Sequence, residues 1–255
     1  MQFRTWLMAL FFVVFARLVS AQQTIMVLNY EQEKIIGANF HTNAGLIGGV
    51  MAQFVKKTGR NSCRLAGLEV VHIKHAQEVK VSSFNTGNTF ILGKQNYLFS
   101  VRPYYGRQWI LFPPAREEGV QVNGNLSGGL SIGIVKPYYI EFDYSRSGDF
   151  SVVEKEPFDP ARHSNANRIM GSGGFFRGFD KSQIAPGLHL RGSLSFYFGN
   201  YGKRISGLEA GGLIEAFVRN GSGGIEGNRI VLIPYTQNPW LYTSLFLNVF
   251  LGWRK

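Results

Sequence analysis

The sequence predicts an all-β chain folded as an eight-stranded antiparallel transmembrane β-barrel, an up-and-down meander with long outer loops. Three observations lead to this fold class: the alternation of the C-terminal segment, an N-terminal export segment, and the unequal lengths of the segments between predicted strands. The alternation alone leaves one alternative open, in which the C-terminal segment is an edge strand of a soluble β-sandwich.

The C-terminal segment, residues 241–255, alternates between two kinds of position for more than ten residues. Leu245 and Leu251 fall on one parity, and Asn248 and Phe250 on the other. An ordinary strand has about five or six residues, whereas a strand crossing an outer membrane needs about 9–11. We therefore expect the leucines to face lipid, Trp253 to lie at the membrane interface and Phe250 to face inward. Barrel-insertion machinery would meet this strand during biogenesis.

The N-terminus has the layout of a cleaved secretory signal peptide. Arg4 precedes an unbroken apolar run at residues 6–16, and small residues end the segment at Ala21. The run of eleven is shorter than the about 20 residues that a membrane-spanning helix needs. The prediction is a signal peptide at 1–21, followed by one barrel domain at 22–255 in the outer membrane of a bacterial cell.

Composition agrees with a barrel. The chain is 14% aromatic and has 31 glycines, while Cys63 is its only cysteine and cannot form an internal disulfide. Only helices and closed barrels satisfy the backbone inside lipid, and no apolar stretch after residue 21 is long enough for a helix. The formal charge of +11 predicts outer-membrane lipid and lipopolysaccharide as partners, rather than nucleic acid.

Eight segments are predicted as strands, an even number as in single-chain bacterial barrels. They are residues 34–40, 46–56, 63–74, 96–112, 120–142, 187–199, 206–219 and 241–255.

The segments between these strands form two classes. Those at 57–62, 113–119 and 200–205 are short, as periplasmic turns are in such barrels. The alternate joins at 75–95, 143–186 and 220–240 are long, and only the one at 41–45 is short. We expect the long loops to lie outside the cell and to contact another envelope protein.

Three stretches resemble a group of small outer-membrane barrel proteins of Bacteroidota. They are Pro-Tyr-Tyr-Ile-Glu at 137–141, Lys-Glu-Pro-Phe-Asp-Pro at 155–160, and the glycine- and leucine-rich pattern of 187–199. The resemblance covers most of the mature chain through diffuse motifs, without a catalytic signature. It implies a small outer-membrane barrel and assigns no active-site residue.

The interior of an eight-stranded barrel is filled by its own side chains. A turn centred near residues 202–203 predicts Arg191 opposite Glu215 and Tyr197 opposite Glu209. Buried charges must be paired, so the sequence favours a salt-bridged plug over a proton or ion path. The inward parity is predicted to carry Arg102, Glu141, His189, Arg191, Glu209, Glu215, Arg219 and Arg254.

Patterns that suggest chemistry are weak. His72 and His75 have a spacing seen in metal sites, but residues i and i+3 of a strand face opposite sides. The glycine-rich segments at 171–174 and 221–224 lack the context of a phosphate-binding loop. No cofactor or metal is therefore expected. Loops 75–95 and 143–186 could still gather a nucleophile–histidine set from His75, Ser82, Ser83, Asp159, His163 and Ser164.

Three functional classes remain. The favoured one is a structural or interaction protein of the bacterial envelope with a side-chain-filled lumen, such as an accessory of a secretion or assembly machine. The alternatives are an outer-leaflet enzyme, such as a lipid A-modifying hydrolase or acyltransferase, and a narrow channel. A nucleophile–histidine pair within about 3.2 Å at the outer rim would favour the enzyme. A continuous water path past Arg191 and Glu215 would favour the channel.

Overall fold

The structure is a computed structural model that describes residues 30–114, 119–145, 152–198, 203–217, 225–226 and 229–255. The predicted signal peptide at 1–21 and the predicted inward residue Arg219 lie outside this range. Within it, no helix is long and apolar enough to cross a membrane.

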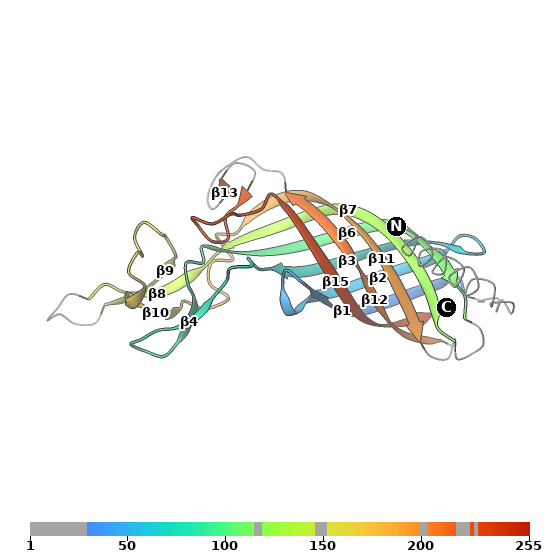
Figure 1. Cartoon of the computed structure of the whole chain (residues 1–255), viewed down its shortest axis with the longest axis horizontal. Coiled ribbons are helices and arrows are strands. Elements are labelled where there is room, and N and C mark those ends of the chain that lie inside the picture. Colours follow the sequence, from blue (N-terminus) through green and yellow to red (C-terminus); the bar gives the residue numbers. More distant parts are fainter. Residues whose placement is uncertain (1–29, 115–118, 146–151, 199–202, 218–224, 227–228) are drawn as a thin grey trace, which may run out of the picture.

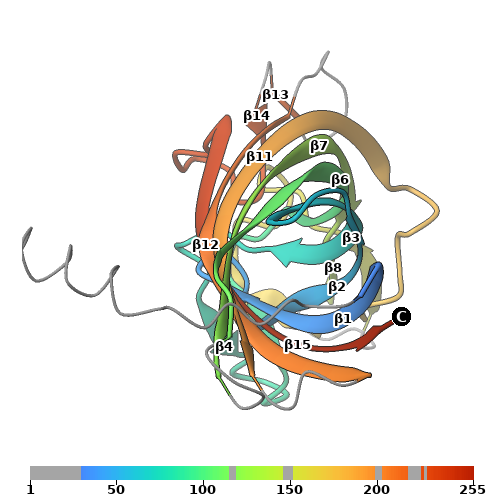
Figure 2. The same cartoon turned by 90° about the vertical axis from the view of Figure 1, so that its right-hand side faces the viewer.

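Eight long strands form a closed antiparallel barrel in the order β1-β15-β12-β11-β7-β6-β3-β2 (Figures 1 and 2). Each strand pairs with the next barrel strand along the chain, and β1 pairs with β15 to close the wall. The predicted up-and-down eight-stranded barrel is thus confirmed. The strands are β1 (Gln32–His41), β2 (Gly45–Lys57), β3 (Ser62–Ile73), β6 (Asn96–Phe112), β7 (Gln121–Pro137), β11 (Gln183–Phe198), β12 (Arg204–Phe217) and β15 (Leu241–Arg254).

Side chains alternate between the two faces of the wall, as strand geometry requires. In β15, Leu245 and Leu251 are 68% and 59% exposed, whereas Asn248 and Phe250 are buried inside. Trp253 follows the outward parity and is 46% exposed. The outer wall is therefore mainly apolar, and the inside holds polar as well as apolar side chains.

The two ends of the barrel differ. The start of β1 lies beside the end of β15, with Glu33 opposite Arg254, and we call this end the terminal end. Short segments join β2 to β3, β6 to β7 and β11 to β12 there. The long segments gather at the opposite end, the loop end (Figure 1).

Part of the long segments folds into a second structure beyond the loop end, which we call the distal platform. It contains a three-stranded sheet and a small hairpin around an apolar core that includes Phe90, Tyr138, Ile140, Phe142 and Ile169 (Figure 1). Its elements are β4 (Lys80–Ser82), β5 (Thr89–Ile91), β8 (Tyr139–Asp143), β9 (Val153–Pro157), the 3₁₀ helix η1 (Ala166–Arg168) and β10 (Ile169–Ser172). A further short hairpin, β13 (Ile225–Glu226) with β14 (Arg229–Ile230), belongs to the last long segment.

One strand prediction was too long. The alternation suggested a single strand over 120–142, but β7 ends at Pro137 and β8 belongs to the platform sheet. The neighbouring β6 begins at Asn96, which pairs with Pro137, so β7 has no partner further along. Glu141 consequently lies outside the lumen, where it forms an ion pair with Lys155 at 2.7 Å.

Candidate functional site

The lumen is filled in layers, beginning with polar groups at the terminal end. Arg254 donates to the Glu33 carboxylate at 2.7 Å and to Gln121 at 3.0 Å. The Tyr197 hydroxyl donates to Glu33 at 3.3 Å and accepts from Gln108 at 3.1 Å. All five side chains are buried.

Interleaved with this polar group is an apolar cluster, the terminal-end apolar layer: Val55 lies opposite Glu33, and Cys63 opposite Gln108. Its side chains are buried and come from seven of the eight barrel strands, so they pack across the lumen from opposite walls. The layer consists of Ile35, Met51, Val55, Cys63, Leu65, Tyr104, Tyr197, Ile205 and Phe250.

At mid-height lies a group of buried charges, which we call the central network. Arg102 contacts two carboxylates of this network. Its Nε and Nη2 donate to the two oxygens of Glu215 at 2.9 and 2.6 Å, and its Nη1 donates to Glu69 at 3.0 Å. Arg191 binds Glu209 at 3.0 Å and lies 3.6 Å from Glu69. Bidentate contact is the strong geometry for an arginine–carboxylate pair.

Three carboxylates thus meet two guanidinium groups, and neutral donors supply further hydrogen bonds. Asn39 donates to Glu69 at 2.7 Å, and Ser100 to Glu215 at 2.7 Å. Asn248 and Ser193 donate to Glu209 at 2.9 and 2.5 Å. Arg191 also lies over the rings of Tyr104 and Phe246, at 4.8 and 4.4 Å from their centroids. These contacts offset the cost of keeping charges away from water.

The loop end of the lumen is closed by a second apolar layer, to which the segment before β15 contributes. Ile230 and Leu232 of that segment are buried among barrel side chains. Leu232 is held in place because its carbonyl accepts from the Gln95 amide at 2.9 Å and its amide donates to Asn238 at 2.9 Å. The layer consists of Val71, Ile73, Leu98, Val135, Ala185, Phe217, Ile230, Leu232 and Tyr242.

The predicted pairing of β11 with β12 was wrong by two residues. Arg191 lies opposite Leu213, Glu215 opposite His189, and Tyr197 opposite Gly207. The connection is centred one residue earlier than expected, and such a shift moves every partner by two while preserving the inward parity. Arg191 and Glu215 therefore both face the lumen, but their partners are Glu209 and Arg102.

Sequence reasoning missed Glu69 and the amides Asn39 and Asn125, and it placed Asn248 on the inward parity without giving it a role. Glu69 lies on β3, whose other inward positions include Cys63 and Val71 of the apolar layers. An inward face that is apolar at both ends shows no polar–apolar alternation. Asn39 and Asn248 lie opposite each other across β1 and β15 and share a hydrogen bond of 2.7 Å.

The histidines do not form a metal site. His72 faces outward and stacks on Phe99 with ring centroids 4.9 Å apart, whereas His75 contacts the carbonyl of Gln237 at 3.4 Å. His189 faces the lumen with Nδ1 3.0 Å from the Ser131 hydroxyl. Among the described residues, no group of three or more His, Cys, Asp or Glu side chains is placed to hold a metal.

The platform brings together a different group from the expected nucleophile set. Nδ1 of the buried His163 accepts from the Asp159 amide at 2.9 Å, so its proton lies on Nε2, which faces Glu156 at 3.1 Å. Tyr144 also donates to Glu156, and Arg162 forms an ion pair with it at 3.1 Å. No hydrogen bond joins His163 to Ser82, Ser83 or Ser164 among the described contacts.

The electrostatics of this platform group follow from its contacts. Burial disfavours the charged form of Glu156, but hydrogen bonds from Tyr144 and His163 outweigh burial, and the pKa of the carboxyl lies below its ordinary value. The hydrogen bond between Tyr144 and Glu156 also raises the pKa of the Tyr144 hydroxyl. This arrangement suits an ion pair that fixes the segment after β9.

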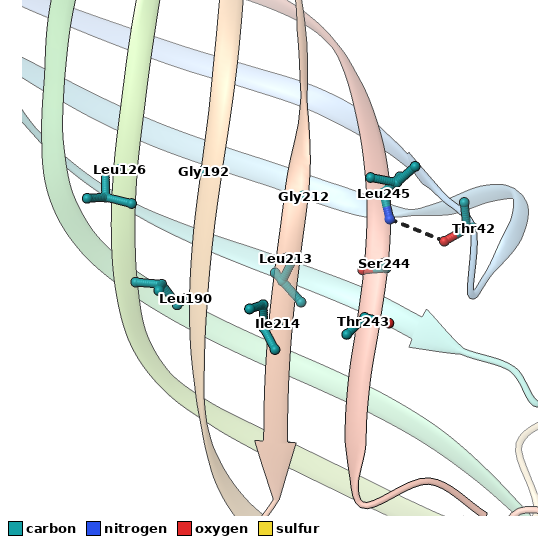
Figure 3. A pocket seen from close by; sticks show the side chains of 10 residues that line it. All are labelled: Thr42, Leu126, Leu190, Gly192, Gly212, Leu213, Ile214, Thr243, Ser244 and Leu245. Carbon is teal, nitrogen blue, oxygen red and sulfur yellow. Dashed lines mark hydrogen bonds between the residues drawn. The ribbon is translucent and has the colours of Figure 1, made fainter.

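A shallow groove of about 640 Å³ lies on the outer wall (Figure 3). Gly192 and Gly212 lie opposite each other and leave the backbone bare, with Leu190 and Leu245 among the side chains beside them. Thr42 accepts a hydrogen bond from the Leu245 amide at 3.3 Å (Figure 3). The lining residues include no titratable side chain, so the groove offers no acid, base or thiol nucleophile.

The fold and the lumen define the class of this protein: a closed eight-stranded antiparallel barrel with a filled interior and an apolar outer wall. No protein-family model and no curated protein sequence matches the chain.

Among solved structures, the chain is similar to Ail, the attachment invasion locus protein of Yersinia pestis. The structure of Ail with the heparin analogue sucrose octasulfate is 10% identical, with 89% of this chain and 99% of that chain covered and a TM-score of 0.37. For Ail without the analogue the identity and coverage are the same and the TM-score is 0.38. Neisserial surface protein A is 11% identical, with 89% and 96% covered and a TM-score of 0.33. At these identities the likeness concerns the fold alone.

Proposed function

We propose that this protein is an exported outer-membrane barrel whose apolar wall lies in the bilayer, with the loop end outside the cell. Along β7 the outward positions from Val122 to Ile134 carry apolar side chains or glycine. At about 3.3 Å a residue and a tilt near 40°, this stretch spans roughly 30 Å, the thickness of a hydrocarbon core. The predicted signal peptide at 1–21 and the resemblance to Bacteroidota barrels belong to the same proposal.

Its function, we infer, is that of a structural or interaction protein of the envelope, acting through the distal platform. The observation that carries this proposal is the filling of the lumen: paired charges lie between two apolar layers. Apolar layers at both ends oppose the passage of ions and of protons, so the lumen acts as a plug. A function in recognition then falls to the ends of the barrel.

The platform suits such a role because it has a buried core of its own and projects beyond the barrel (Figure 1). The segment between β4 and β5 carries Phe84, which is 96% exposed, and β9 is an edge strand of the three-stranded sheet. Large exposed apolar side chains and edge strands are both typical of surfaces that meet another protein. The partner we propose is another envelope protein, as for an accessory of a secretion or assembly machine.

Photo-crosslinking in native outer membranes tests this proposal. Benzoylphenylalanine would replace Phe84 on the platform and, as the matched control, the exposed Arg204 at the terminal end. We expect a discrete protein adduct from position 84 and none from position 204. An adduct from position 204 alone would move the interaction to the other end. Absence of adducts from both, together with altered lipid A in a deletion strain, would support the enzyme instead.

A further inference from the structure

The segment between β10 and β11 folds back on the outside of the barrel, next to the platform but not within its core. The amides of Lys181 and Ser182 bond to the carbonyls of Gly178 and Phe179, at 3.3 and 3.2 Å. Gly178 has a φ of +82°, and a Cβ there would lie 2.5 Å from the Tyr139 ring. The segment is therefore a tight turn pressed against the start of β8.

Aromatic rings fasten this turn to the barrel wall. The ring of Phe175 lies 5.8 Å from that of Tyr97 and 6.0 Å from that of Phe99, and the ring of Phe179 lies 6.3 Å from that of Phe99. The ammonium of Lys136 lies among them, 4.7, 5.4 and 5.1 Å from the centroids of Tyr97, Phe175 and Phe179. Lys136 is buried and its ammonium has no hydrogen-bond partner among the described residues, so the ring faces are what hold the cation.

The turn nevertheless presents an apolar face. Phe175, Phe176 and Phe179 are 46%, 84% and 45% exposed within five residues. Arg177 and Lys181 are exposed beside them, and Asp180 is the one acidic side chain of the turn. Phenylalanines next to two cations form the pattern of a segment that lies at the boundary between acyl chains and anionic headgroups.

The height of the turn on the wall matches that boundary. Ile134 is the last outward apolar residue of β7, and Lys136 is the next outward position. Ile184, 67% exposed, follows the turn on β11 and continues the apolar wall below it. The turn therefore lies one side-chain step above the apolar wall, where aromatic and basic residues collect in membrane barrels.

We propose that residues 174–181 form a lateral lipid anchor on the barrel wall. In this anchor Phe175, Phe176 and Phe179 enter the edge of the acyl-chain region, and Arg177 and Lys181 bind the phosphate groups of anionic lipids. The ligand is thus the headgroup layer of the surrounding membrane. The proposal rests on the membrane placement given under the proposed function.

Nitroxide labels can locate the turn relative to lipid in the full mature barrel, reconstituted in phosphatidylcholine vesicles with or without phosphatidylglycerol. In a Cys63→Ser background, cysteines would replace Phe176 in the turn, Leu130 on the outer wall and Phe84 on the platform. Oxygen concentrates in the bilayer, whereas a nickel chelate stays in water. We expect the Leu130 and Phe176 labels to be relaxed more by oxygen, and the Phe84 label more by the chelate.

A second comparison tests whether Arg177 and Lys181 bind anionic headgroups. Phosphatidylglycerol should move the Phe176 label deeper, and Arg177→Gln with Lys181→Gln should abolish that shift. The matched control, Lys80→Gln with Arg168→Gln, removes the same charge from the platform and should leave the shift intact. An unchanged depth with phosphatidylglycerol would overturn the assignment of anionic headgroups.

The controls separate failure of the anchor from failure of the membrane placement. A lipid-exposed Leu130 label with a Phe176 label that behaves like Phe84 would overturn the anchor alone. A Phe176 label shielded from both reagents would mean that a second copy or another protein covers the turn, which also overturns it. A Leu130 label relaxed mainly by the chelate would contradict the membrane barrel itself.

Discussion

Arg102 is the residue on which the lumen depends most. Its planar fork meets Glu215 with two hydrogen bonds and Glu69 with a third, which a lysine could not reproduce because its ammonium is a compact point charge. A partner left alone in a buried site is an uncompensated charge, so the two carboxylates depend on this side chain.

Removal of one member of the Arg102–Glu215 pair should destabilise the barrel more than removal of both. Arg102→Met leaves Glu215 without its guanidinium and should cost about 3–5 kcal/mol, and Arg102→Met with Glu215→Leu should recover part of that loss. Urea unfolding in detergent of the native protein, the two single variants and the double variant gives the coupling energy. We expect it to be about 0.5–3 kcal/mol. Arg191→Met with Glu215→Leu should show weaker coupling, because these two side chains are not direct partners. Stronger coupling in the Arg191 cycle would contradict the register of β11 and β12.

Two glycines of the barrel differ in how much space surrounds them. A Cβ at Gly129 would lie 2.0 Å from the Pro103 carbonyl oxygen of the neighbouring strand, whereas a Cβ at Gly192 would meet no atom within 4 Å. Gly129→Ala should therefore lower the unfolding free energy by about 1–3 kcal/mol, and Gly192→Ala should change it by less than about 0.5 kcal/mol. Equal midpoints in the same urea titration would show that the two strands are not packed as described.

At the scale of the strands, β11 offers a measure of depth in the membrane. Leu190 lies outward in the middle of the strand, and Phe198 is its last residue, also outward. Leu190→Arg should cost about 2–4 kcal/mol in liposomes, and Phe198→Arg only about 0–1 kcal/mol, because the penalty for a charge falls towards the interface. Equal penalties would place the bilayer elsewhere on the wall.

The stability of the platform should depend on pH through Glu156, whereas the barrel should not share this dependence. The lowered pKa of Glu156 means that its ionised form stabilises the platform fully above the unfolded value of 4.5, and that this contribution is lost as the pH falls through the lowered pKa. Cleavage of the platform by an acid-active protease should therefore rise with acidification. The barrel should stay folded in the same samples, which a difference in gel migration between unheated and heated protein would report. Glu156→Gln should flatten this dependence, and an equally steep curve in that variant would assign it to other carboxyl groups.

The strands were predictable where the two faces differ along their whole length. In β11 and β15, leucines alternate on the lipid side with inward residues that include serine, asparagine and arginine, and the bounds of both strands were predicted within a few positions. Glu69 was not predicted because the other inward side chains of β3 belong to the two apolar layers. The end of β7 at Pro137 was not predicted because a single sequence does not show which strands pair. Side-chain partners such as Arg102 and Glu215 depend on the whole barrel closing, which no local pattern encodes.

For the whole molecule, the described structure divides into a filled barrel and a platform that projects from one end (Figure 1). The charged centre lies between two apolar layers, and the segment around Leu232 completes the layer at the loop end. A barrel built this way holds its shape through its interior and leaves its rims and outer loops for contact with other molecules.

Ion conductance of the purified barrel in a planar lipid bilayer tests the central claim that the lumen is a plug. We expect no conductance steps from the native protein, with an open porin in the same bilayer as the positive control. Reproducible steps that disappear in Arg102→Met with Glu215→Leu would show that ions pass the central network, and would replace the plug with a channel.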